Sequence, residues 1–298
     1  MTEGILSEIT VTIVSYNSGA MIEACLGALS ETHALIIVDN ASTDGSPDRL
    51  SRAFPNAKLV RNAQNVGYGT AMNQAMALVE TPYALHLNPD AVLTLGALET
   101  LLDTLKAGGE KAVLAAPLLI DPNRGLNLNT MGPGEVEGGP ISPEPEGPFC
   151  TWSITGAVWL VHVSNWRALA GFDENIFLYN EDFEFCRRAT RAGYSLLVEP
   201  RATGEHLTSQ STPPSLRIRW RKEWNIIWGL LYVTRKFEGP GQATRDAWRL
   251  FGKCGLKAIF YMLVLDKKRF FRDLAIAHAA ATFLLQSTFG RNLRARRA

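Results

Sequence analysis

Short apolar runs alternate with amphipathic stretches over the first hundred residues of the chain. The run ITVTIV at 9–14 predicts a buried strand, and the apolar spacing after it predicts a helix capped by Asn17 or Ser18. The same pattern is repeated, with further strands predicted at 35–38, 58–60 and 83–87 and helices beginning near 46, 70 and 96. Such repeats are typical of an α/β fold with a Rossmann-like, mostly parallel sheet and helices on both faces.

The pattern changes further along the chain. Residues 121–150 are dense in Gly and Pro, which predicts a long loop without regular structure. Strands are then predicted near 157–163 and 195–198, with a helix over 181–192. Long amphipathic helices are predicted at 216–236, 243–265 and 268–285. We therefore predict an α/β domain over residues 1–212 and a helical region over residues 213–298.

Polar residues follow the predicted strands where each strand ends. Asn17, Asp39 and Asp90 each come just after an apolar run. Because ligands of doubly wound sheets bind at the carboxyl ends of the strands, these three side chains are expected to converge on one crevice.

Composition and charge narrow the class of protein. With 298 residues and 46% apolar residues the chain can build a sizeable core. The four cysteines show no regular spacing, which argues against a disulfide framework or a zinc site and favours a cytoplasmic location. The first residues do not resemble a secretory signal, and no stretch is apolar for long enough to cross a bilayer.

Charge is divided unevenly along the chain. Residues 215–298 contain 18 Lys and Arg against 5 Asp and Glu, a formal charge of +13, and residues 1–214 carry −12. Such a basic tail predicts an anionic partner. Because no nucleic-acid-binding module is recognised, nucleic acid is not the expected partner.

Basic groups border the apolar faces of the C-terminal helices. This combination predicts peripheral binding at the inner face of the cell membrane, where cations meet lipid phosphates. The side chains of Trp220, Trp224, Trp228 and Tyr232 form an aromatic stripe that suits this boundary. The alternative is that these helices pack on the first domain or on a second subunit, as in a homodimer.

A series of short motifs links the predicted strand ends. The motifs are VSYN with Tyr16 and Asn17, VDNASTDGS with Asp39 and Asp44, NVGYGTAMNQA with Asn65 and Gly67, LNPDA with Asn88 and Asp90, and GFDENIFLYNEDFEFCRRATRAGY. In this order, over roughly residues 9–208, they resemble the family 2 inverting glycosyltransferases of the GT-A fold. The resemblance implies a hexosyltransferase that uses a nucleoside diphosphate sugar.

On the donor side, the resemblance implies that Asp39 binds the pyrimidine base and ribose. A carboxylate suits the N–H donor of uracil or thymine. Donor-binding positions are also implied at Tyr16, Asn17, Asn65, Gly67 and Asn88. The alternative is that Asp39 ends a strand and Asp44 caps a turn.

The resemblance implies a divalent metal site at Asp90. Hard oxygen ligands favour Mg²⁺ or Mn²⁺. Asn88 stands where the family usually has a first acid, and it can offer an amide oxygen. His206, in GEHLTSQS, matches a histidine that faces the diphosphate or metal in related enzymes. The alternatives are an ordinary turn at Asn88 and a structural role for His206.

Asp182 is the predicted general base. It opens a predicted helix, where the helix dipole favours an ionised carboxylate, and it matches the family's acid that faces the acceptor. The acceptor-side positions implied with it are Gly156, Ala157, Glu181 and Arg188. The alternative is that the acids at 181 and 182 only complement the helix dipole.

The motifs LNPDA and YNEDFEF look most like those of bacterial rhamnosyltransferases. This resemblance favours dTDP-L-rhamnose as the donor, among nucleoside diphosphate sugars of the dTDP or UDP type. It also favours a saccharide acceptor carried on a polyprenyl diphosphate, as in cell-envelope polysaccharide assembly. Two rivals stay open: a non-catalytic sugar-nucleotide-binding partner of another transferase, and a nucleotidyltransferase. Dinucleotide binding at Gly67 and Gly69 is disfavoured, because the third glycine of that motif is missing.

Overall fold

The computed structural model describes residues 7–27, 29, 34–121, 125–127, 146–206 and 215–288. Contacts divide the chain into two compact units. The first is Met1–Phe172 with Asp182–Thr212, and the second is Asp173–Glu181 with Pro213–Ala298. A short segment before Asp182 therefore groups with the C-terminal helices, and the domain division after residue 212 stays a prediction.

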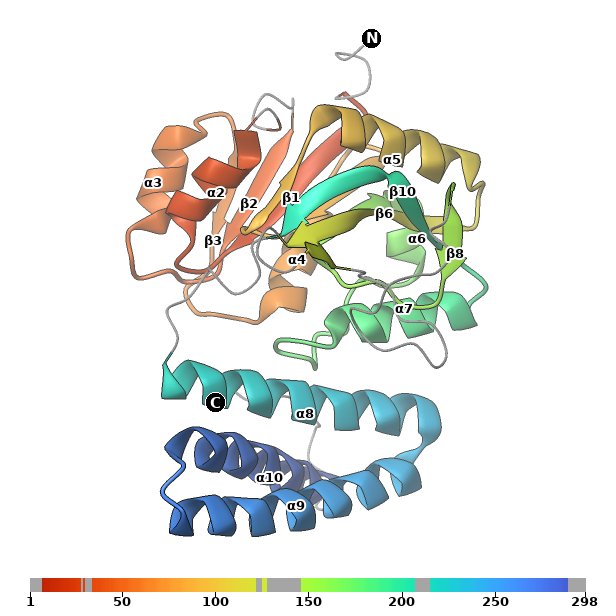
Figure 1. Ribbon diagram of the computed structural model, residues 1–298. Helices are drawn as coiled ribbons and strands as arrows, with labels where there is room; N and C mark the ends of the chain where they lie inside the picture. The colour runs from red at the N-terminus through yellow and green to blue at the C-terminus, as the bar shows by residue number, and fades with distance from the viewer. Residues whose placement is uncertain are drawn as a thin grey trace. The chain divides into compact units, whose positions relative to one another are not determined.

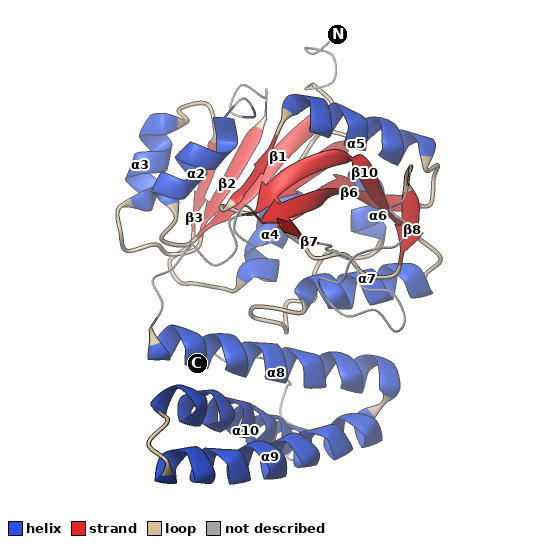
Figure 2. Cartoon of the chain, in the orientation of Figure 1, coloured by secondary structure: helices blue, strands red, loops and turns tan. Residues whose placement is uncertain are grey.

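The first unit is built on a mixed sheet with helices on both faces (Figures 1 and 2). Its strand order is β3-β2-β1-β4-β9-β6-β10-β5, with β7 paired to β6 and β8 to β10. The strands are β1 (Ile9–Ser15), β2 (Leu35–Asp39), β3 (Lys58–Arg61), β4 (Tyr83–Leu87), β5 (Ala91–Leu93), β6 (Ala112–Asp121), β7 (Gly125–Asn127), β8 (Phe149–Thr151), β9 (Val158–His162) and β10 (Ser195–His206). The helices are α2 (Gly19–Leu26), α3 (Ser46–Ala53), α4 (Tyr68–Ala77), α5 (Leu95–Ala107), α6 (Val163–Ala168) and α7 (Glu181–Arg191).

The α/β prediction is confirmed, but the sheet is mixed rather than mostly parallel. Strands β3, β2, β1 and β4 are parallel, as the repeated pattern predicts. Strand β9 then lies antiparallel between β4 and β6, and β5, β7 and β8 are also antiparallel to their partners. The sequence pattern did not reveal β6, whose run contains Pro117. Pro117 lies where the β10 register shifts, because proline has no N–H to donate to the ladder.

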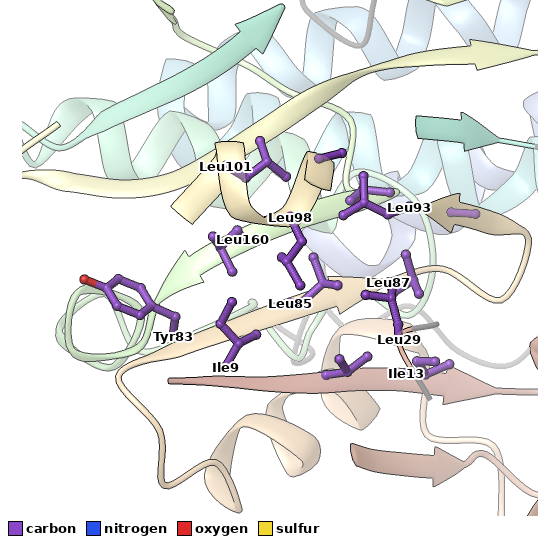
Figure 3. Packing of buried hydrophobic residues seen from close by; sticks show 14 of the residues in the cluster. Ile9, Ile13, Leu29, Tyr83, Leu85, Leu87, Leu93, Leu98, Leu101 and Leu160 are labelled. Atoms are coloured by element: carbon purple, nitrogen blue, oxygen red, sulfur yellow. The ribbon is translucent and has the colours of Figure 1, made fainter. Parts of the chain in front are cut away.

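Two apolar layers hold the helices onto the sheet. Helices α2, α3 and α5 pack on one face through a cluster that includes Ile9, Ile13, Leu98 and Leu101. Figure 3 shows α5 side chains directed at the strand residues of this layer. Helices α4, α6 and α7 pack on the other face around Trp159. Because successive side chains of a strand point to opposite faces of the sheet, each strand contributes to both apolar layers. The two layers together fix the strand ends relative to one another.

The long loop predicted at 121–150 is interrupted by short strands. Strand β7 pairs with the end of β6, and β8 pairs with β10, so the prediction of no regular structure is wrong at these places. Residues 122–124 and 128–145 lie outside the described residues. The Gly and Pro content hid two strands of only three residues each, which is too short for a periodic signal.

The second unit contains three long helices, as predicted: α8 (Leu216–Glu238), α9 (Pro240–Leu263) and α10 (Lys267–Thr288). None of the helices in the described part of the chain is both long and apolar enough to cross a membrane. The aromatic stripe of α8 is a core rather than a lipid-facing surface. Trp224 and Trp228 are buried and stacked, and their indole N–H groups donate to His278 and Gln286 of α10.

The segment Asp173–Glu181 packs on α8 within this unit. Asp173 Oδ2 accepts hydrogen bonds from Tyr232 and Lys236, which lowers the pKa of this carboxyl against the opposing effect of burial. The Asn180 amide donates to the carbonyl of Ile226. Tyr179 and Asn180 both adopt left-handed backbone conformations, so the contact with α8 stabilises an otherwise unfavourable turn.

Gly229 of α8 allows this turn to approach the helix. A Cβ at residue 229 would lie 2.8 Å from Asn180 Nδ2 and 3.1 Å from Tyr179 O. We expect Gly229→Ala to lower the free energy of unfolding by about 1–3 kcal/mol, because the added methyl overpacks this contact. The measurement is urea unfolding followed by tryptophan fluorescence.

Gly252→Ala is the matched control, because a Cβ at residue 252 of α9 meets nothing within 4 Å. Removing a helical glycine there should leave stability unchanged or raise it by up to about 1 kcal/mol. Equal effects of the two substitutions would contradict the packing role of Gly229.

Candidate active site

The ends of β1 and β2 form one side of the candidate site. Ser15 and Asp39 are register partners at the two strand ends. Asn17 adopts a left-handed conformation, and its Oδ1 accepts a hydrogen bond from the Thr43 amide. The backbone N–H of Asn17 donates to the Ser42 hydroxyl, and the backbone N–H of Ser42 donates to Asp39 Oδ2. The structure therefore brings Asn17 and Asp39 together.

Asp39 has unused hydrogen-bonding capacity. Its side chain is buried, and Oδ1 has no hydrogen-bond partner among the described residues. A buried carboxylate oxygen without a donor is unfavourable, so a ligand N–H that reached this atom would be bound strongly. Tyr16, which precedes Asn17 on the turn after β1, is exposed.

Asn40 organises the next loop, and sequence reasoning assigned it no such role. Its Nδ2 donates to Asn65 Oδ1 and to the carbonyl of Gly67, at 3.0 and 3.2 Å. Its Oδ1 accepts from the Val66 amide and from Asn62. One buried amide thus holds the loop before α4 against the end of β2. Asn40 directly follows Asp39, and this adjacency is the only sequence signal that could have suggested its role.

Asn88 links this loop to β9. Its Oδ1 accepts a hydrogen bond from the Tyr68 hydroxyl at 3.1 Å, and its backbone amide donates to the carbonyl of Ala157 at 2.9 Å. Gly67 immediately precedes Tyr68, so the predicted donor residues Asn65, Gly67 and Asn88 belong to one hydrogen-bonded neighbourhood.

Asp90 and His206 meet because β5 pairs with the end of β10. Ala91 is the register partner of His206, which places the preceding Asp90 beside the imidazole. Asp90 Oδ1 lies 3.2 Å from His206 Nε2. The His206 Nδ1 atom is buried and has no partner among the described residues.

This pair fits a divalent ion as two of its ligands. Adjacent ligands about 2.1 Å from an octahedral ion lie about 3.0 Å apart, close to the observed separation. The carboxylate suits Mg²⁺ or Mn²⁺, whereas an imidazole favours transition metals, so of these two ions the pair suits Mn²⁺ better. No group of three His, Cys, Asp or Glu side chains that could hold a metal occurs in the described ranges.

Asp182 lies beside the start of β9. Its Oδ2 accepts a hydrogen bond from the Gly156 amide at 2.9 Å, and its Oδ1 accepts from the Phe183 amide at 2.7 Å. A Cβ at residue 156 would lie 3.1 Å from Asp182 Cβ, so glycine permits this approach. The two backbone N–H donors hold the Asp182 carboxylate in place beside Gly156.

The other predicted acceptor-side residues are placed differently. Arg188 makes two hydrogen bonds to the buried Glu184 carboxylate and donates to the carbonyls of Leu169 and Gly171. These contacts tie α7 to the turn after α6, which gives Arg188 a structural function that the sequence did not indicate. Glu181 is buried and belongs to the second unit. An acceptor-side role for Arg188 or Glu181 stays a prediction.

One series of hydrogen bonds therefore spans the predicted site in the first unit. It runs from the loop held by Asn40 through Tyr68 to Asn88, and from Ala157, next to Gly156, to Asp182. Asp90 follows Asn88 by two residues. The structure thus brings several of the predicted site residues together, and their roles stay predictions.

Family models match the chain over most of its length. The model described as glycosyl transferase family 2 matches residues 10–154, and that described as glycosyl transferase family group 2 matches residues 84–290. The chain belongs to glycosyltransferase family 2 and is a glycosyltransferase, which leaves the nucleotidyltransferase and non-catalytic alternatives without support.

A curated relative and two solved structures are similar to the chain. The relative is the N-acetylglucosaminyl-diphospho-decaprenol L-rhamnosyltransferase of Mycobacterium tuberculosis, 28% identical over 68% of this chain and 76% of its own. The mannosyltransferase PcManGT from Pyrobaculum calidifontis, solved with GDP-Man and Mn²⁺, covers 93% of this chain and 87% of its own, at 15% identity and a TM-score of 0.57.

The second solved structure is GalNAc-T7 with UDP, GalNAc and Mn²⁺. It covers 74% of this chain with a TM-score of 0.57 and 14% identity, and this chain spans 47% of its length. At these identities the two structures show the fold alone, which is the GT-A fold predicted from the motifs.

Asn40→Asp tests the loop network. The substitution keeps the shape but replaces the Nδ2 donor with a charged oxygen that faces Asn65 Oδ1 and the Gly67 carbonyl. We expect the free energy of unfolding to fall by about 1–3 kcal/mol, together with the affinity for a nucleoside diphosphate. Urea unfolding and calorimetric titration with dTDP and UDP measure the two effects.

Asn165→Asp is the matched control. Asn165 is also buried and also donates its amide to two acceptors, the carbonyls of Glu110 and Ala112, but on α6 away from the loop. This variant should lose stability and keep nucleotide affinity. If both variants kept their affinity, Asn40 would have no part in forming the nucleotide site.

Proposed function

We propose that the protein transfers L-rhamnose from dTDP-L-rhamnose to a saccharide acceptor carried on a polyprenyl diphosphate, with inversion at the anomeric carbon. The rhamnosyltransferase relative and the LNPDA and YNEDFEF motifs support this choice of donor. The relative is named for a decaprenol-diphosphate-linked saccharide, which also supports a lipid-linked saccharide as acceptor. The proposal places the reaction in cell-envelope polysaccharide assembly.

The donor nucleotide binds at the ends of β1 and β2. Asp39 Oδ1 accepts the N–H of the pyrimidine, and this pairing provides the buried oxygen with the donor that it lacks. Tyr16 and Asn17, on the turn that follows β1, contact the same nucleotide. The loop residues Asn65 and Gly67 and the side chain of Asn88 complete the donor side.

Asp90 and His206 would hold a divalent ion, Mg²⁺ or Mn²⁺. The ion would supply positive charge that offsets the negative charge developing on the departing diphosphate. The solved structures of the two similar glycosyltransferases contain Mn²⁺, which supports a divalent ion here.

Asp182 removes the proton of the attacking hydroxyl. The acceptor oxygen forms a bond to the anomeric carbon as the bond from that carbon to the diphosphate breaks, and the hydroxyl proton passes to the Asp182 carboxylate. The observation that carries the proposal is the linkage of Asp182, through Gly156 and Ala157, to Asn88 and the neighbouring Asp90. The base and the cation ligands are thereby fixed in one unit.

The acceptor places the enzyme at the cytoplasmic face of the cell membrane. A polyprenyl chain stays in the bilayer while its saccharide extends into water. The formal charge of +13 on residues 215–298 favours an anionic membrane surface as the site of attachment.

Asp182→Asn tests the base. We expect turnover to fall about 10²–10⁴-fold, because the amide cannot accept the proton, while calorimetric affinity for dTDP-L-rhamnose is retained. The exposed Asp103→Asn serves as the control, since it removes a carboxylate on α5 without touching the site. Turnover of the Asp182 variant close to that of the control would refute the assignment.

Asp90→Ala tests the cation site. In the presence of Mn²⁺, donor affinity should fall at least about tenfold, equal to 1.4 kcal/mol, because one of the two protein ligands is lost. Without a divalent ion, the variant and the unmodified protein should bind the donor alike. Calorimetric titrations with Mn²⁺ and with a chelator decide this, and an equal loss under both conditions would argue against a cation at Asp90.

A further inference from the structure

The last turns of α9 and the connection to α10 expose a continuous set of apolar side chains. We call this set the apolar corner; it consists of Leu256, Ile259, Phe260, Met262, Leu263, Val264 and Leu265. Leu263 is 73% exposed and Leu265 is 83% exposed, so these side chains have almost no protein contact within the structure. Exposed apolar patches on soluble proteins are typical of interaction surfaces.

The corner is not needed to hold the helices together. The side of this part of α9 that faces inward consists of small buried residues, Cys254 and Ala258. The core of the unit is instead formed by the aromatic side chains of α8 with residues of α9 and α10. The described apolar core of the unit therefore does not include the residues of the corner.

Cations surround the apolar corner. Lys253 and Lys257 are exposed on α9, and Lys267, Lys268 and Arg269 are exposed at the start of α10. The acids nearby are Asp266, which pairs with Arg269, and Asp273, which is buried and pairs with Arg272. The rim thus keeps a positive charge around an apolar centre.

We propose that this corner is the element that inserts into an anionic phospholipid membrane, with Leu256, Leu263 and Leu265 among the acyl chains and the lysines at the lipid phosphates. The membrane proposal rests on the proposed function in one respect: an enzyme that uses a lipid-linked acceptor must work at a membrane. A second copy of the chain is a poorer occupant, because a symmetric contact would oppose the same cations on both subunits.

The proposal replaces the surface expected from the sequence. Trp224 and Trp228 of the aromatic stripe are buried and cannot meet lipid, whereas the corner lies on the succeeding helix pair and is exposed.

Cosedimentation of the full chain with vesicles tests the corner. The vesicles are phosphatidylcholine alone or phosphatidylcholine with about one third phosphatidylglycerol, an anionic lipid. We expect binding to the anionic vesicles and a loss of roughly fivefold in the partition coefficient for each rim lysine changed to Gln. The double variant Leu256→Ser with Leu263→Ser should partition at least roughly tenfold less than the unmodified protein.

The matched control is Leu230→Ser with Leu285→Ser. Both leucines are exposed on the same helical unit, and Leu285 lies about 27 Å along α10 from Lys267. The control should bind vesicles like the unmodified protein, and circular dichroism melting confirms that both double variants fold. Equal partition of the two double variants, or no binding of the unmodified protein to anionic vesicles, would overturn the proposal.

Two further measurements separate this surface from the other hypotheses. Turnover with a short soluble acceptor should be the same for the corner variant and the unmodified protein. Vesicle binding without any sugar transfer would refute the proposed function and leave the corner standing. Light scattering after gel filtration detects a dimer, and a dimer that the corner variant abolishes while it still binds vesicles would assign the surface to self-association instead.

Discussion

The antiparallel pairing of β9 with β4 is the constraint on which the candidate site depends. Leu87 and Val158 are register partners, so the residues after β4 and the residues before β9 meet at one edge of the sheet. The Asn88 amide then bonds to the Ala157 carbonyl, and the neighbouring Gly156 amide bonds to Asp182. A parallel strand at this place would carry Gly156 and Ala157 to the opposite edge. The mixed sheet therefore brings a predicted donor-binding residue, Asn88, next to the predicted acceptor-side residues Gly156 and Ala157.

Local pattern could predict the donor half of the fold but not this pairing. The strands followed by Asn17, Asp39 and Asn88, and the helices after them, follow from periodicity, and the structure contains them. The predicted cap of α2 is not formed, because Ser18 stands at the N-cap position without a side-chain hydrogen bond to the helix. Strand β6 was missed because Pro117 and small side chains obscure its apolar run, and β9 was predicted without its direction. Strand pairing depends on contacts between distant segments, for which a single sequence carries no direct signal.

Side-chain roles show the same division. The motifs indicated Asp39, Asp90 and Asp182, since acids at strand ends and helix starts have a chemical use there. The supporting roles of Asn40 and Arg188 depend on which carbonyls and amides surround them, and these come from separate elements. For α8, the periodicity correctly predicted a helix with an aromatic stripe. Apolar periodicity is equally compatible with a core and with a lipid-facing surface. Packing of Trp224 and Trp228 against α10 shows that this part of the stripe is core.

The contacts of Asn88 bear on the order of binding. One lone pair of the Asn88 amide oxygen accepts a hydrogen bond from Tyr68, which leaves the other for a cation. On the proposed function, Asp90, His206 and at most this one oxygen would hold the ion, and so few protein ligands would hold Mg²⁺ or Mn²⁺ weakly in water because the ion keeps most of its hydration shell. A bound diphosphate would supply further oxygens, so cation and donor would bind cooperatively. Asn88 in place of an acid strengthens this coupling, because a second carboxylate would bind the ion without the nucleotide.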